Sequence, residues 1–177
     1  RILANLTKEK DSLIIESSEK GTSSMLHITF EADPKMINFI SFNGASFKII
    51  NNPQLPKNNI SSLKVGKITN SGNNWEGNYI DLKTPIHLEY GNTITVTAYS
   101  EKPLSLLLKL EKTNNKTIST ECNVIHTGNG WEELKYTFSS SKKYNRLVIF
   151  IDGPGTTSGS FYIDDITQSN SKIQLKK

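Results

Sequence analysis

Apolar and polar residues alternate with a period of two along most of this 177-residue chain. The alternation is clearest between Thr93 and Ser100, where every second residue is apolar: Ile94, Val96 and Ala98. Successive side chains of a β-strand point to opposite faces, so we expect these three on the core face and their neighbours on a half-solvated face. No window of 11 residues or more carries the 3.6-residue apolar stripe of a helix. The pattern predicts an all-β protein.

Turn signals rich in Gly, Asn and Pro divide the chain into about eleven short candidate strands. They are Ser12–Glu16, Met25–Glu31, Ser46–Ile50, Ser61–Lys67, Asn78–Leu82, Thr93–Ser100, Leu104–Glu111, Lys116–His126, Glu133–Ser139, Arg146–Asp152 and Ser160–Thr167. Short strands joined by regular turns are typical of sandwiches and barrels. We therefore expect an antiparallel β architecture with one core.

The strand Leu104–Glu111 repeats the alternation, with three leucines on one side: Leu106, Leu108 and Leu110. The opposite side carries Leu107, Lys109 and Glu111. A sheet that presents Tyr99, Lys109 and Glu111 to water is a candidate binding face. An ion pair between Lys109 and Glu111 that only solubilises the sheet is the alternative interpretation.

Length and composition limit the classes of protein. A mass of 19.8 kDa fits one domain, for which we take residues 21–177, while the polar residues 1–20 are expected to be a partly ordered leader or inter-domain segment. The basic residues are scattered, which argues against a nucleic-acid groove. Apolar runs such as Leu104 to Leu108, which Ser105 interrupts, are far too short to span a bilayer. Cys122 is the only cysteine, which excludes an intrachain disulfide and a cysteine zinc cluster.

The last candidate strand contains two adjacent acids, Asp164 and Asp165, inside an apolar run. One of the two side chains should point toward the packed side, where a carboxylate needs a cation or several hydrogen-bond donors. Calcium suits such a position because it takes carboxylate and carbonyl oxygens in irregular geometry. Glu31 and Asp33 are candidates for the second carboxylate, and pairing of these acids with Lys or Arg is the alternative.

Two tryptophans require a choice between burial and binding. Trp131 precedes a segment whose alternate residues look like core, namely Leu134, Tyr136 and Phe138, and we expect it to be core as well. Trp75 lies in a turn-like segment of Asn and Gly, where it is either a stacking platform or a lid over the sandwich edge.

The sequence contains no recognisable catalytic motif. The three histidines, His27, His87 and His126, lie in separate segments without metal-binding spacing, and a paired or solvent-facing role is expected for each. Glu132 and Glu133 are neighbours in a strand, so their side chains point apart. No nucleophile elbow or phosphate-binding loop occurs.

An ordered set of motifs supports a family resemblance over residues 25–168: "TFE", "NNWEGNYIDLKTPIHL", "TITVTAYSEKPLSLLLKLE", "GWEELKYTF", "NRLVIFIDGPG" and "FYIDDI". In this order they resemble bacterial β-sandwich carbohydrate-binding modules similar to families 4 and 16, which are appended to secreted glycoside hydrolases and surface glycan-binding proteins. The resemblance implies an antiparallel, jelly-roll-like β-sandwich without catalytic activity. It also implies a structural calcium held by Glu31 and Asp164.

The expected function is therefore that of a non-catalytic carbohydrate-binding module, monomeric and secreted or at the cell surface, that targets an appended enzyme or receptor to a polysaccharide. A β-glucan, either β-1,3- or mixed-linkage, is the favoured ligand. The alternatives are a jelly-roll polysaccharide lyase or glycosidase, and a structural or adhesion sandwich without a sugar ligand. The candidate sugar-binding residues are Trp75, Tyr79, Tyr99, Lys109, Glu111 and Asp152.

Overall fold

The computed structural model describes residues 25–53 and 62–169 and places eleven strands in them. Their bounds are β1 His27–Ile28, β2 Ile40–Phe42, β3 Ser46–Asn51, β4 Lys64–Asn70, β5 Gly77–His87, β6 Thr93–Ser100, β7 Leu104–Lys112, β8 Asn115–His126, β9 Gly130–Thr137, β10 Lys143–Ile151 and β11 Gly159–Ser169. One 3₁₀-helix, Pro34–Met36, lies between β1 and β2. The expected leader 1–20 and the expected strand Ser12–Glu16 lie outside the described residues.

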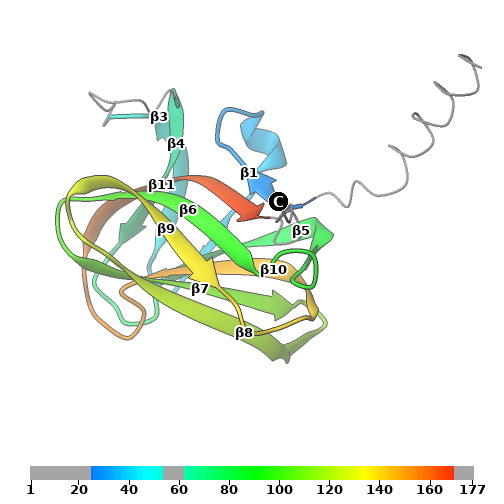
Figure 1. Cartoon of the computed structure of the whole chain (residues 1–177). Coiled ribbons are helices and arrows are strands. Elements are labelled where there is room, and N and C mark those ends of the chain that lie inside the picture. The colour runs from blue at the N-terminus through cyan, green and yellow to red at the C-terminus, as the bar shows by residue number, and fades with distance from the viewer. Residues whose placement is uncertain (1–24, 54–61, 170–177) are drawn as a thin grey trace, which may run out of the picture.

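The strands form two antiparallel sheets. Sheet A has the order β3-β4-β11-β6-β9, with β1 paired to β11, and sheet B has the order β2-β5-β10-β7-β8. The two sheets pack face to face, with β11, β6 and β9 in the upper layer of Figure 1 and β10, β7 and β8 in the lower layer. The prediction of an all-β antiparallel sandwich is confirmed.

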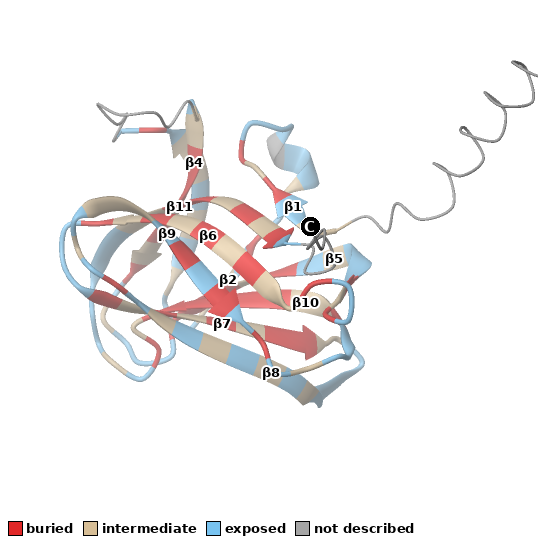
Figure 2. Cartoon of the chain, viewed as in Figure 1, coloured by how far each residue is buried: buried red, intermediate tan, exposed pale blue. Residues whose placement is uncertain are grey.

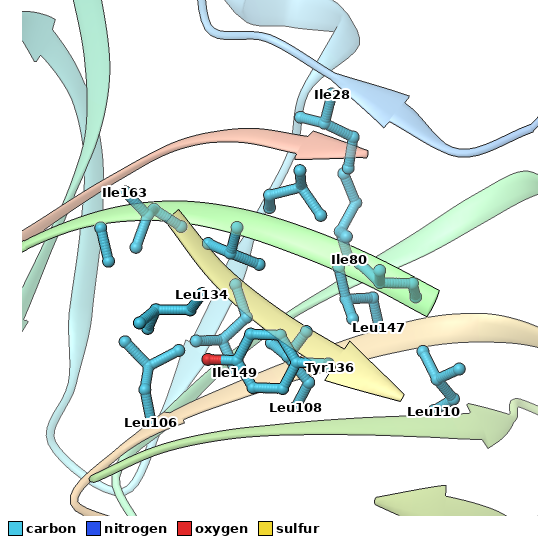
Figure 3. Close-up of a cluster of buried hydrophobic side chains, with 14 of the residues drawn as sticks. Ile28, Ile80, Leu106, Leu108, Leu110, Leu134, Tyr136, Leu147, Ile149 and Ile163 are labelled. Carbon is cyan, nitrogen blue, oxygen red and sulfur yellow. The ribbon is translucent and has the colours of Figure 1, made fainter. Parts of the chain in front are cut away.

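The alternation seen in the sequence becomes the alternation of burial in the two sheets. The expected core residues of β6 and β7 are all at most 2 % exposed: Ile94, Val96, Ala98, Leu106, Leu108 and Leu110. Figure 2 shows the resulting buried and partly exposed bands along the strands. Figure 3 shows the cluster between the layers, where Leu134, Tyr136 and Ile163 from sheet A meet leucines and isoleucines from sheet B.

Buried amides connect the two sheets at the ends of the sandwich. Asn70 of β4 donates from Nδ2 to the carbonyl of Ile151 in β10, at 3.1 Å. Gln168 of β11 donates from Nε2 to the carbonyls of His87 and Gly91, at 3.0 and 2.7 Å. These bonds pair side-chain donors with backbone oxygens of other segments, and the bonds from Asn70 and from Gln168 to His87 link sheet A to sheet B.

The expectation that Trp131 is a core residue is wrong. Its register partner is Tyr99, and both side chains lie on the outer face of sheet A, where their rings meet at a centroid distance of 5.5 Å. Leu134, Tyr136 and Phe138 of the same segment are in the core, as expected. The error arises because Trp131 has the opposite parity to these three residues and lies at the start of the strand.

Tyr136→Phe is expected to leave the free energy of unfolding unchanged or to raise it by up to about 1 kcal/mol. The Tyr136 side chain is fully buried, and its hydroxyl has no hydrogen-bond partner among the described residues. Burial raises the pKa of Tyr136, so the group remains a neutral hydroxyl that has left water without compensation. Denaturant unfolding measures the change.

Tyr144→Phe is the matched control, because Tyr144 is equally buried and its hydroxyl lies 2.8 Å from the Ser140 hydroxyl. This variant should lose about 1 kcal/mol. Equal losses in the two variants would contradict the assignment of Tyr136 as an uncompensated group.

Among the described residues, no helix is long and apolar enough to cross a membrane.

Candidate functional site

Strand β10 is apolar on both faces, although only one face contributes to the core. Its inward residues Leu147 and Ile149 belong to the core cluster, whereas Val148 and Phe150 point outward from sheet B and are only 4 and 9 % exposed. A continuous apolar strand is typical of a sheet that is covered on both sides. The outer side of β10 is therefore covered by side chains from neighbouring segments.

The strand register brings those side chains into rows across sheet B. Phe150 lies opposite Gly77 and Leu107, and Val148 lies opposite Tyr79 and Lys109. The third row joins Asp81, Arg146 and Glu111. We call this surface the β10 face and define it as Phe42, Trp75, Tyr79, Asp81, Leu107, Lys109, Glu111, Arg146, Val148 and Phe150.

Four aromatic rings form the apolar centre of the β10 face. Phe42 and Trp75 both meet Phe150 edge to face, at centroid distances of 5.7 and 5.6 Å, and Tyr79 lies 6.2 Å from Phe42. Trp75 remains 44 % exposed. Gly77 makes this packing possible, because a Cβ atom there would lie 2.4 Å from the Phe42 ring.

The loop between β4 and β5 holds Trp75 in position through Glu76. The Glu76 side chain is 1 % exposed and accepts hydrogen bonds from the Ser71 amide and hydroxyl and from the amides of Gly72 and Asn73, at 2.5 to 3.2 Å. Burial by itself raises the pKa of Glu76, but these donors outweigh it, and the pKa lies below its ordinary value. The Trp75 amide also donates to the Gly153 carbonyl at 2.6 Å. These hydrogen bonds fix the loop and therefore the position of the Trp75 indole.

Charged groups border the aromatic centre. Arg146 binds Asp81 through two hydrogen bonds, Nε to Oδ1 at 2.6 Å and Nη2 to Oδ2 at 2.9 Å, and its guanidinium lies 4.0 Å from the centre of the Tyr79 ring. The Arg146 hydrogen bonds hold the pKa of Asp81 below its usual range. Lys109 Nζ lies 2.9 Å from Glu111 Oε1. A ligand on this face would meet flat apolar rings in the middle and hydrogen-bonding groups at the edge.

The structure brings together four of the six expected sugar-binding residues. Tyr79, Lys109 and Glu111 lie on the outer side of sheet B, and Trp75 contacts Phe150 at its edge. The expectation that Glu111 is presented to water is wrong, because the residue is only 9 % exposed and pairs with Lys109. The expectation that Tyr99 shares a sheet with Lys109 is wrong, because β6 belongs to sheet A.

Asp152 is placed in the turn after β10. Its Oδ2 accepts hydrogen bonds from the amide and hydroxyl of Thr157, and its carbonyl accepts one from the Gly155 amide at 2.6 Å. The carboxylate therefore organises this turn.

Several residues of the β10 face were not among the expected sugar-binding residues: Phe42, Asp81, Arg146, Val148 and Phe150. Strand β2 was not expected, because three residues are too few for a periodic signal. A usable signal did exist in β10, since its unbroken run of apolar residues after Arg146 indicates that both of its sides are covered.

The expected calcium ligands lie in two environments. Asp164 is fully buried, its Oδ1 accepts the Asp165 amide at 2.9 Å, and its Oδ2 has no hydrogen-bond partner in the described part of the chain. Glu31 is exposed and accepts the Lys64 amide at 2.8 Å. Asp33 is exposed and accepts the Lys35 amide at the start of the 3₁₀-helix.

The charge on Asp164 is not neutralised by an ion pair within residues 25–53 and 62–169. Burial raises the pKa of Asp164, the Ser62 hydroxyl opposes this effect, and the carboxylates of Asp165 and Glu31 raise it further. In the same residues, no three side chains of His, Cys, Asp or Glu are gathered closely enough to hold a metal ion by themselves. A cation at Asp164 therefore needs backbone or hydroxyl oxygens as additional ligands.

The histidines have ordinary structural partners. His126 is fully buried, with Nε2 at 3.1 Å from the Ala98 carbonyl and Nδ1 accepting the Gly128 amide at 2.9 Å. His27 contacts the Thr167 hydroxyl, and the His87 ring stacks on Tyr90. The three histidines lie apart, as expected, but His87 is not fully satisfied, because its buried Nδ1 has no hydrogen-bond partner among the described residues.

Three solved structures are similar to this chain in fold. The family 11 carbohydrate-binding module of Clostridium thermocellum, in complex with a β-1,3-1,4-mixed-linked tetrasaccharide, matches with a TM-score of 0.59 and 13 % identity over 82 % of this chain and 94 % of that one. The CBM22-1 xylan-binding domain of Paenibacillus barcinonensis Xyn10C matches with a TM-score of 0.51 and 11 % identity over 82 and 92 %. The arabinose-bound α-L-arabinofuranosidase MgGH51 matches with a TM-score of 0.59 and 10 % identity over 77 % of this chain. The match covers only 24 % of that enzyme.

At identities of 10 to 13 %, these structural matches show a shared fold alone. No curated protein sequence gives a match. A family model does: residues 26–159 match the model CBM_4_9, described as "Carbohydrate binding domain". The match covers the whole β10 face and every strand except β11, of which it includes only Gly159, and the chain belongs to this family of carbohydrate-binding domains.

Proposed function

We propose that this chain is a non-catalytic module that binds a β-glucan, either β-1,3- or mixed-linkage, on the β10 face. The observation that carries the proposal is the cluster of Phe42, Trp75, Tyr79 and Phe150 with charged groups at its border. Binding sites for small polar ligands usually combine aromatic walls with a few placed polar groups. The mixed-linkage tetrasaccharide bound by the family 11 module of the same fold supports the choice of glucan.

The chemistry of a glucan chain fits this arrangement. A β-linked glucose ring has two flat faces made of C–H groups and a rim of hydroxyls, so it stacks on an exposed indole and hydrogen-bonds at its edge. Trp75 supplies the exposed ring, while Lys109, Glu111 and Arg146 supply donors and acceptors along neighbouring strands. Affinity in the micromolar to millimolar range, about 4 to 8 kcal/mol, is expected for such a site.

In its biological setting the module holds an appended enzyme or a surface receptor on its polysaccharide, outside the cell, and acts as a monomer. Family membership and the occurrence of this fold inside a larger arabinofuranosidase support a role as one part of a longer protein. Absence of product release from every polysaccharide that the module retains is the result expected of a binder.

Trp75→Ala is expected to weaken glucan binding at least tenfold, about 1.4 kcal/mol, because it removes the exposed ring of the β10 face. Isothermal titration calorimetry with mixed-linkage β-glucan, laminarin, xylan and cellulose oligosaccharides measures the affinity. Tyr90→Ala is the control, since Tyr90 is another exposed aromatic residue but stacks on His87 in the β5–β6 turn. Binding of a folded wild-type chain to none of these sugars would refute the proposed function.

A structural calcium ion bound at Asp164 is the second part of the proposal. The buried Oδ2 without a partner fits a cation, and Glu31 is close enough to act on Asp164 electrostatically. Asp164 and Glu31 would supply the charged oxygens, and backbone carbonyls would complete the coordination. Bound calcium neutralises the buried carboxylate and ties β11 to the segment around Glu31.

A further inference from the structure

Three aromatic side chains form a row on the outer face of sheet A, on the opposite side of the sandwich from the β10 face. Tyr99 of β6 is the register partner of both Trp131 in β9 and Tyr162 in β11. The ring centroids are 5.5 Å apart for Tyr99 and Trp131 and 6.0 Å apart for Tyr99 and Tyr162. The three strands run side by side in the upper layer of Figure 1.

The row differs from the rest of this surface. Farther along β6 and β9, the outward positions that pair with each other are polar: Thr93 with Thr137, Thr95 with Lys135, and Thr97 with Glu133. The aromatic residues are thus concentrated at one end of the strands. None of the three belongs to the core cluster or to the β10 face.

A pocket of about 390 Å³ opens beside the row, between the β6–β7 turn and the segment that enters β11. Tyr99 and Tyr162 line it together with polar groups: Glu101, Lys102, Ser158 and Ser160. Its volume lies in the range that small-molecule sites usually have, roughly 300 to 1,000 Å³. The Tyr99 hydroxyl donates to Glu101 Oε1 at 2.9 Å, which fixes the phenol at the edge of the pocket.

The row and the pocket together repeat the composition of the β10 face. Each surface has adjacent aromatic rings and, within reach of them, at least one acidic and one basic side chain: Glu101 and Lys102 here, Glu111 and Lys109 there. The two surfaces share no residue, because one lies on sheet A and the other on sheet B.

We propose that the row and pocket form a second carbohydrate-binding site, which we call the Tyr99 site and define as Tyr99, Glu101, Lys102, Trp131, Ser158 and Tyr162. The inference rests on the proposed function, since it assigns the same class of ligand. Sites on the outer faces of opposite sheets engage two polysaccharide chains at once. The module therefore cross-links chains and gains avidity on an insoluble polymer, where the second contact is an intramolecular event.

Nuclear magnetic resonance on the full 177-residue chain tests the two sites separately. The mixed-linkage β-1,3-1,4-glucan tetrasaccharide and xylohexaose are titrated, and the backbone amides of Tyr99 and Tyr162 are followed beside those of Lys109 and Phe150. In the wild type, both sets should shift. In Trp75→Ala, the Tyr99 and Tyr162 signals should still shift, with an affinity within twofold of the wild type.

The reciprocal variant is Tyr162→Ala. It should bind the soluble tetrasaccharide at the β10 face with unchanged affinity but lose at least about tenfold in retention on insoluble glucan. Tyr162→Phe, which keeps the ring, should retain the wild-type behaviour, and Lys135→Ala controls for an exposed change elsewhere on the same face. Melting curves of all variants confirm that the chain remains folded.

The pattern of shifts distinguishes failure of the Tyr99 site from failure of the proposed function. Shifts confined to Lys109 and Phe150, with unchanged retention of Tyr162→Ala, would overturn the Tyr99 site and leave the proposed function intact. A folded wild type in which neither sugar shifts either set of amides would overturn both. Shifts at both sets, with the tenfold loss in Tyr162→Ala, establish the second site.

Discussion

Glu76→Ala is expected to lower the free energy of unfolding by about 3 kcal/mol, because several donors lose a charged acceptor at once. The carboxylate is buried and receives hydrogen bonds from Ser71, Gly72 and Asn73. For a domain of this size the melting temperature should fall by roughly 6 to 12 °C. Glucan affinity should fall at least about tenfold as well, since the same loop presents Trp75. Thermal unfolding and calorimetry measure the two effects.

The pH dependence of stability gives an independent check on Glu76. Its pKa in the folded chain lies below the ordinary value of 4.5, so its contribution is complete above that value and is lost as the pH falls through the folded-state pKa. The wild type should therefore lose stability on acidification below pH 4.5, and Glu76→Gln should lack this part of the pH dependence. Glu133→Ala, an exposed acid, should change stability by less than about 0.5 kcal/mol. A Glu76→Ala change no larger than that of Glu133→Ala would contradict the bracing role.

Strand parity could be predicted because it is a local property. The side-chain direction in β6 and β7 follows from alternation within eight or nine residues, and every residue expected in the core there is buried. The same rule placed Lys109 and Glu111 on an outer face. Local alternation says which side of its own strand a residue occupies, and this is enough to find a core.

Sheet membership could not be predicted from the same information. Tyr99 and Lys109 are ten positions apart in consecutive strands, yet the turn at Glu101–Pro103 carries the chain from sheet A to sheet B. Consecutive strands often pair, which made a shared sheet the natural expectation. The β10 face likewise depends on contacts between segments far apart in the sequence, such as Phe42 with Phe150. Neither set of contacts has a local signature.

Removal of calcium is expected to lower the stability of the wild type by about 4 kcal/mol relative to calcium at a thousand times its dissociation constant. The melting temperature should differ by roughly 8 to 16 °C between the two conditions. The physical reason is the buried Asp164 carboxylate, whose Oδ2 has no hydrogen-bond partner among the described residues and which needs a cation to offset its desolvation. Thermal unfolding in calcium and in a chelator measures the difference.

Whether Asp164→Asn is more or less stable than the wild type should depend on calcium. In the chelator, Asp164→Asn should be more stable than the wild type, because it removes a buried charge that no ion pair among the described residues neutralises. In calcium it should be less stable, because it no longer gains from the ion. Asp33→Asn is the control: Asp33 is exposed and already accepts the Lys35 amide, so its variant should keep most of the calcium response. Identical melting temperatures of the wild type in calcium and in chelator would refute the calcium site. If Asp33→Asn abolished the stabilisation by calcium and Asp164→Asn did not, the ion would instead bind beside the 3₁₀-helix.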